Sequence, residues 1–192
     1  MKNLLYGFLV LVWTLPQPAR AESSAVSDIE VQVTTAGEEL RIGVGLEIAA
    51  PPRLVWAVFT DYEHMTDILS NLKVSKVLAR RGNVLEVYQQ GRAEHGLLSY
   101  SFESTREFRL TPYRKIEFHL LKGTMRKMEG RLLLQARGAG THVQFHVDTI
   151  PDVFLPPVLG KAFIEHETRE QFGQWRDEVL RRAAAQPSKP RQ

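Results

Sequence analysis

The sequence of 192 residues contains no cysteine. This absence excludes disulfide bonds, thiolate metal ligands, cysteine nucleophiles and the lipid-modified cysteine of an exported lipoprotein. The sequence also lacks a nucleophile elbow, a phosphate-binding loop, an HExxH helix and a paired-carboxylate motif. It therefore gives no support for a hydrolase, and we expect neither a metal nor another cofactor.

Long hydrophobic runs are also missing. The longest, residues 4–15, is about a dozen residues, whereas a bilayer span requires ~20. Lys2 precedes this run, and Pro16, Pro18 and Ala19-Arg20-Ala21 follow it, as in a cleavable signal peptide. We expect a signal peptide over residues 1–21, cleavage after Ala21 and a periplasmic or secreted protein without a stable membrane span. An uncleaved anchor is the alternative that the short run disfavours.

Net charge is small once this segment is removed. The full chain has 25 basic and 22 acidic residues, and residues 1–21 contain two of the basic residues, Lys2 and Arg20, and no acidic one. The mature chain then has 23 basic and 22 acidic residues, a formal charge of +1. Such a balance creates no long-range field that would gather phosphates, so a nucleic-acid partner is not expected.

The hydrophobic pattern predicts one domain over residues 29–182. Residues 22–28 and 183–192 are small and polar, so we expect a flexible N-terminus and a disordered tail. Apolar residues alternate over 29–33 and 40–48, which indicates a hairpin or one long kinked strand. Two short helical segments follow between Pro52 and Leu69.

From Leu72 to Val147 apolar residues again recur with a period of two, and five turns divide this stretch into six strand-like segments. Turns about every ten residues favour antiparallel pairing, because parallel strands require longer crossovers. A long helix follows from about Pro157 to Ala184. The prediction is an α+β fold in which a curved antiparallel sheet of six or seven strands wraps around a long C-terminal helix, with two short helices after the first strand.

Three local sequences resemble the START-like, or SRPBCC, superfamily with its helix-grip fold, and in particular its polyketide cyclase/dehydrase and coenzyme-Q-binding-protein branch. The resemblance extends from Ile48 to about Arg182, although most members of this branch lack an export signal. It implies a cavity between sheet and terminal helix for a lipid, isoprenoid, sterol-like or polyketide molecule, and no fixed catalytic residues. The sequences are APPRLVWAVFTDY (50–62), GRLLL (130–134) with GTHV (140–143), and PPVL (156–159).

The candidate ligand-binding residues are large apolar groups on the inward face of the predicted strands and residues along the terminal helix. Their alternative role is to fill a solid core. On the helix, His166 and Arg169 interrupt the apolar stripe, so this turn either overhangs the sheet in water or crosses a cavity and contacts a guest. The candidates are Tyr88, Tyr100, Phe102, Phe118, Met125, Met128, Phe145, Phe163, His166, Arg169 and Phe172.

Histidines suggest a metal site only weakly. His142 and His146 share one strand face, but that face is opposite Val143, Phe145 and Val147 and is expected to be solvent-exposed. A zinc site normally requires three or four protein ligands, so we predict no metal site.

Three functions remain open. The first is an exported protein that binds or carries an apolar small molecule. The second is a cyclase/dehydrase-type enzyme in which His166, Arg169 or Tyr100 moves a proton. The third is a ligand-free docking module for an envelope protein partner, with the exposed stretch around Glu63 and Asp67 as its contact.

Overall fold

The computed structural model describes residues 29–95, 98–152 and 157–186. The predicted signal peptide, the predicted flexible segment 22–28 and residues 187–192 of the predicted tail lie outside these ranges. The terminal helix, α3 (Pro157–Ala184), ends beyond the predicted domain boundary at Arg182.

The described chain forms one antiparallel sheet of eight strands, which confirms the fold class and corrects the strand number upwards. The extra strand arises because the first apolar stretch is a hairpin of two strands, with Gly37 at φ +64° in its turn. The helical segment predicted after the first strand therefore follows the second, and it contains three short helices where two were predicted. The strands are β1 (Glu30–Ala36), β2 (Glu39–Ile48), β3 (Leu72–Arg81), β4 (Val84–His95), β5 (Leu98–Thr111), β6 (Lys115–Gly123), β7 (Met125–Arg137) and β8 (Gly140–Pro151).

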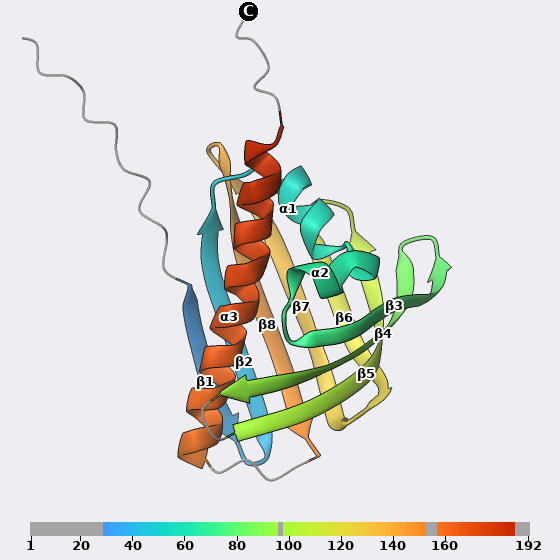
Figure 1. The fold of residues 1–192 in the computed structure, drawn as a ribbon, viewed down its shortest axis with the longest axis vertical. Coiled ribbons are helices and arrows are strands. Elements are labelled where there is room, and N and C mark those ends of the chain that lie inside the picture. Colours follow the sequence, from blue (N-terminus) through green and yellow to red (C-terminus); the bar gives the residue numbers. More distant parts are fainter. Residues whose placement is uncertain (1–28, 96–97, 153–156, 187–192) are drawn as a thin grey trace, which may run out of the picture.

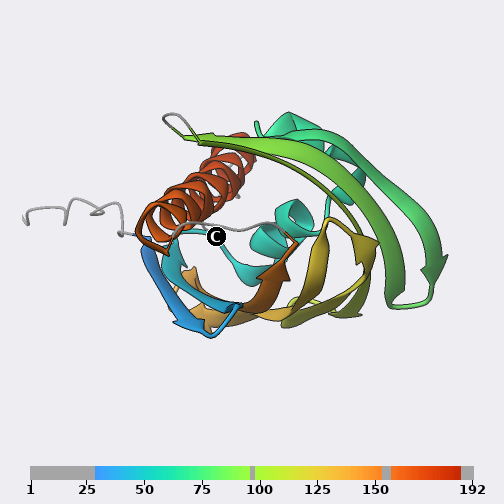
Figure 2. The same ribbon diagram turned by 90° about the horizontal axis from the view of Figure 1, so that it is seen from below.

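The strand order is β1-β2-β8-β7-β6-β5-β4-β3. β2, near the N-terminus, pairs with β8, the last strand of the chain. β1 and β3 are therefore the two edge strands of the sheet. The sheet curves, and α3 lies along its concave side (Figure 1). Seen from below, the sheet bends into an incomplete ring, and α3 lies across its open side (Figure 2). This is the predicted helix-grip arrangement.

Three short helical segments connect β2 to β3: α1 (Pro52–Phe59), a 3-10 turn η1 (Tyr62–His64) and α2 (Met65–Ile68). Helices this short are not stable alone, so burial against the sheet and α3 must hold them. Tyr62 and Met65 are buried, and the indole Nε1 of Trp175 on α3 donates to the sulfur of Met65 at 3.1 Å. The connection is thereby fixed to the terminal helix.

Aromatic packing joins α3 to the rest of the domain. Trp175 stacks on Phe59 with ring centroids 4.8 Å apart, and Phe172 lies 5.1 Å from Trp175 and 5.2 Å from Phe145 on β8. Such contacts contribute about 0.5–1.5 kcal/mol each beyond the burial of area. They anchor the C-terminal half of α3, and Phe172 and Trp175 also line the site described next.

Candidate functional site

A cavity of about 290 Å³ lies between the concave face of the sheet and α3. Its walls are largely apolar, as the sequence predicted, and the space is not filled solidly by the core. Eight of the predicted residues line it: Tyr100, Phe102, Phe118, Met125, Met128, Phe145, Phe163 and Phe172.

Three predicted residues lie elsewhere. Tyr88 is on the outer face of β4, where its hydroxyl donates to Oε2 of Glu103 at 3.1 Å, because Val87 and Gln89 take the inward positions of this strand. His166 and Arg169 border two separate surface grooves. At 3.6 residues per turn, both point away from the middle of the cavity-facing stripe of α3.

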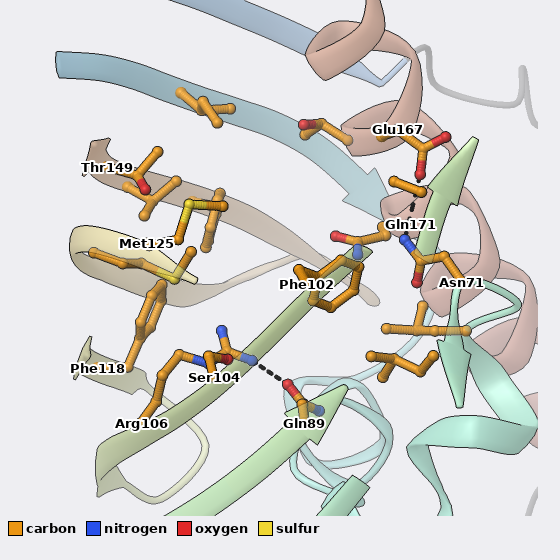
Figure 3. Close-up of a pocket in the computed structure, with 18 of the residues that line it drawn as sticks. Asn71, Gln89, Phe102, Ser104, Arg106, Phe118, Met125, Thr149, Glu167 and Gln171 are labelled. Carbon is orange, nitrogen blue, oxygen red and sulfur yellow. Dashed lines mark hydrogen bonds between the residues drawn. The ribbon is translucent and has the colours of Figure 1, made fainter. Parts of the chain in front are cut away.

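The cavity also has polar residues that the sequence did not single out (Figure 3). Gln89, Ser104 and Arg106 come from β4 and β5, and Thr149 comes from β8. The strand pattern could have identified the first three. Gln89 lies on the same face of its strand as buried Leu85 and Val87, and Ser104 and Arg106 lie on the same face as Phe102 and Phe108. On α3 the polar lining residues are Glu167, Thr168 and Gln171.

Arg106 is the most unusual of these residues. Its guanidinium carbon lies 5.1 Å from the ring centre of Phe108 and 5.5 Å from that of Phe118, and Nη2 donates to Oε1 of Gln89. Its Nε is enclosed without a hydrogen-bond partner. No carboxylate of the described chain forms an ion pair with this arginine. Burial lowers its pKa to about 10, so the group still carries its positive charge at neutral pH.

A chain of hydrogen bonds orients this guanidinium. The hydroxyl of Ser75 donates to the backbone carbonyl of Tyr62, and the amide Nε2 of Gln89 donates to that hydroxyl at 3.1 Å. The amide oxygen of Gln89 is consequently directed at Arg106. Because Ser75 and Gln89 are both buried, the positive charge is held in one place rather than on a mobile side chain.

A polar layer separates the cavity from the surface beside α3. Nδ2 of Asn71 donates to Oε2 of Glu167 at 3.4 Å, and Oδ1 of Asn71 is buried without a partner (Figure 3). Asn71, Glu167 and Gln171 line both the cavity and an outer groove that also includes His166. The cavity is therefore apolar within, with one fixed cation in its wall and amide and carboxyl groups at one side.

The groups considered for catalysis or metal binding are not gathered in the cavity. Tyr100 borders it, but its hydroxyl donates to the carbonyl of Thr124 at 3.2 Å. His142 and His146 are paired with Glu47 at 2.7 Å and with Asp148 at 3.2 Å. Across residues 29–95, 98–152 and 157–186, no cluster of three or more histidine or acidic side chains has the arrangement of a metal site.

The sequence model of one protein family, described as polyketide cyclase / dehydrase and lipid transport, matches residues 48–172. The chain belongs to this family. A comparison with curated proteins found no match for this family member. None of the helices in its described part is long and apolar enough to cross a membrane.

Solved structures resemble this family member in fold. The Zhui aromatase/cyclase from Streptomyces sp. R1128 is 18% identical with a TM-score of 0.65, covering 76% of this chain and 96% of the other. The STAR-related lipid transfer protein from Xanthomonas axonopodis is 10% identical with a TM-score of 0.66, covering 81% and 99%. Human STARD10 is 13% identical with a TM-score of 0.61, covering 82% and 75%. These likenesses support the START-like fold predicted from the sequence.

Proposed function

We propose that the protein is an exported carrier of a small molecule that has an apolar body and one electron-rich group, such as a carboxylate, a phosphate or a polarised carbonyl. The observation that supports the electron-rich group is Arg106, a partly buried cation without an ion pair to the described residues, in the wall of a mostly apolar cavity. Its placement on a strand, fixed by Gln89, favours a specific contact over a nonspecific one.

The physical argument concerns the cost of an unmatched charge. A charged group removed from water is unfavourable unless hydrogen bonds and an opposite charge compensate it. Gln89 supplies only a neutral acceptor, and Nε remains without a partner. A ligand oxygen placed beside this guanidinium would complete the compensation, and a charge-assisted hydrogen bond is stronger than a neutral one.

The remaining walls suit the apolar body of such a ligand. Met125 and Met128 have flexible, polarisable side chains that adapt to an imprecise shape. The volume of about 290 Å³ lies near the lower end of the range for small-molecule sites, which is about 300–1,000 Å³. We therefore propose one compact guest rather than a long lipid with two extended chains. Delivery outside the cytoplasm is supported by residues 1–21 and stays part of the proposal.

The test uses two fluorescent probes with similar apolar bodies. Anilinonaphthalene sulfonate has an anionic group, and N-phenylnaphthylamine has none. Both should bind, and Arg106→Gln should weaken binding of the sulfonate probe at least tenfold while leaving the neutral probe within about twofold, since a hydrogen bond to a charged group contributes about 1.5–3 kcal/mol. Arg109→Gln is the matched control, because Arg109 is exposed on the same strand and pairs with Glu107 at 3.0 Å. Equal losses for both probes would contradict the proposal.

A cyclase-type enzyme is the second candidate, and the same arginine favours it. A fixed cation can stabilise an enolate oxygen that develops during ring closure. Of the three residues predicted to move a proton, only Tyr100 borders the cavity, which makes the carrier the better-supported function. Mass spectrometry of a molecule extracted from the protein, before and after incubation with fresh protein, separates the two: an unchanged mass and fragmentation pattern supports a carrier, and conversion to a product supports an enzyme.

A further inference from the structure

At one end of the domain, three segments distant in sequence come together outside the cavity. The backbone amide of Leu110, near the end of β5, donates to the carbonyl of Asn83 at 2.8 Å, which places the β3–β4 turn beside the end of β5 that leads into the β5–β6 turn. The ring of Tyr113 in the β5–β6 turn lies 5.9 Å from that of Trp56 on α1. We call this surface the basic-aromatic end, and it consists of Arg53, Trp56, Arg80, Arg81, Tyr113 and Arg114.

Charge distinguishes this surface from the rest of the chain. The segments that form it, 51–60, 78–85 and 108–116, contain six basic residues. Arg109 and Lys115 pair at 3.0 Å with Glu107 and Glu117, which flank the third segment, and the other four form no ion pair among the described residues. On the outer face of the sheet, by contrast, arginines pair with carboxylates, as Arg137 does with Glu47 at 2.8 Å and Arg126 with Glu38 at 2.9 Å. Within the described residues, Arg80, Arg81 and Arg114 are exposed and form no such pair.

An exposed aromatic ring lies among these cations. Tyr113 is 44% exposed, and its backbone has φ +62°, a left-handed conformation that is unfavourable for a bulky residue. The guanidinium of Arg53 lies 5.3 Å from the centre of its ring. Leu78, near the end of β3, is also 52% exposed. Protection of the β3 edge by charge would account for Arg80 and Arg81, but not for the aromatic residues or for Arg53 and Arg114.

We propose that the basic-aromatic end docks the protein on a bilayer surface that contains anionic lipid. Unpaired arginines attract anionic headgroups, and each contributes about fivefold to binding near such a surface. Tyrosine and tryptophan are enriched at the level of the headgroups, because each has an apolar ring and a polar tip. An acidic protein would match the arginines alone, whereas a lipid surface matches the arginines, the exposed ring and Leu78 together. This inference does not depend on what the cavity holds.

The test measures co-sedimentation with vesicles of equal parts phosphatidylglycerol and phosphatidylcholine, and with vesicles of phosphatidylcholine alone. The chain is used from residue 22 onwards, which retains every described residue and removes the apolar run 4–15. We expect binding to the anionic vesicles that falls steeply with salt, and at least tenfold weaker binding to the neutral ones. Absence of binding to the anionic vesicles at low salt overturns the proposal.

Two double variants of equal charge locate the surface. Arg80→Gln/Arg81→Gln should weaken binding to anionic vesicles about 25-fold, from about fivefold for each arginine. Arg126→Gln/Arg137→Gln removes the same charge from the outer face of the sheet and should change binding by less than about fivefold. Similar losses in both double variants would overturn the assignment of this end. The sulfonate probe should still bind Arg80→Gln/Arg81→Gln with unchanged affinity, which separates failure of docking from failure of the carrier proposal.

Discussion

Removal of the cavity cation should stabilise the empty protein, although it should impair ligand binding. The proposed change is Arg106→Met/Gln89→Leu. Methionine replaces the arginine because it is a long, unbranched side chain without charge. Leucine replaces Gln89 because the amide oxygen of Gln89 would lose its hydrogen-bond donor once Arg106 is removed. Ser75, the other partner of Gln89, keeps its hydrogen bond to the carbonyl of Tyr62.

The magnitude follows from the environment of the guanidinium. Burial lowers the pKa of Arg106 from its ordinary 12.5 to about 10, which corresponds to a penalty on the charged form of about 3 kcal/mol. Loss of the contacts with the rings of Phe108 and Phe118 returns about 1 kcal/mol. The double variant should therefore be more stable by about 2 kcal/mol, which raises the melting temperature by roughly 4–8 °C in a domain of this size.

The sign of the pH dependence provides a further check. Because the pKa of the folded state lies below that of the unfolded state, the penalty is fully present below about pH 10 and is relieved only as the pH rises above that value. The gain in the free energy of unfolding should consequently be the same at pH 6 and pH 8. Urea denaturation of protein that was unfolded to release ligand and then refolded measures it at both values.

A matched control uses the exposed arginine of the same strand. Arg109→Met should change the free energy of unfolding by less than about 0.5 kcal/mol, since exposed ion pairs contribute little. If the double variant is less stable than the wild type, or if Arg109→Met gains as much, Arg106 is a structural residue and the argument from its unmatched charge fails.

Three further predictions concern the scaffold. Gly91→Ala should destabilise the domain by about 1–3 kcal/mol, because the new Cβ would lie 2.1 Å from the backbone oxygen of Asn71. Gly43→Ala is the control, and it should change the free energy of unfolding by less than about 0.5 kcal/mol, since no atom lies within 4 Å of the new Cβ. Urea denaturation measures both, and equal effects would count against the prediction. Phe172→Ala should cost about 3–5 kcal/mol, since this 2% exposed ring packs on Phe145 and Trp175, and a melting temperature close to that of the wild type would contradict the packing described. A hydrogen bond to Asp61 raises the pKa of His64 above 6.5, so His64 should stabilise the fold below pH 6.5 and lose this effect as the pH rises through the raised value. In urea denaturation, the free energy of unfolding of the wild type should therefore exceed that of His64→Ala by more at pH 5.5 than at pH 8.5. An equal difference at both pH values refutes this prediction.

Alternation along the strands was sufficient to predict most of the fold. Segments such as 100–110 are read directly, because residues that share a phase in the sequence share a face of the sheet. The number of strands was less accessible, since the distinction between a hairpin and a kinked strand depends on the turn at Gly37. Pairing of β2 with β8 depends on contacts between distant parts of the chain, which periodicity does not encode.

The candidate site was predicted in part, and the errors have physical causes. Tyr88 was chosen for its aromatic character although its neighbours Val87 and Gln89 define the inward phase. On α3, His166 and Arg169 were placed on the cavity side because the apolar stripe from Phe163 to Phe172 was continued through them, whereas the buried position between these two residues is Thr168. The buried stripe of a helix is narrow, so a small error in its angular position exchanges the polar residues that face the cavity with those that face solvent.

Apolar walls alone would say little about the proposed guest, because many apolar molecules would fit them. A cation in the cavity wall is more informative. Apolar residues such as Phe102 and Phe118 lower the free energy of the folded state whether or not a ligand is present, whereas burial disfavours the charged form of Arg106 and lowers its pKa, so we expect an apolar replacement to stabilise the empty protein. Residues that cost stability in the empty state persist where binding or chemistry requires them. Ser75 and Gln89 hold this charge in position through a chain of hydrogen bonds. Three residues therefore act together to place the charge. For this reason the chemistry of the guest is to be sought first in what a fixed guanidinium binds.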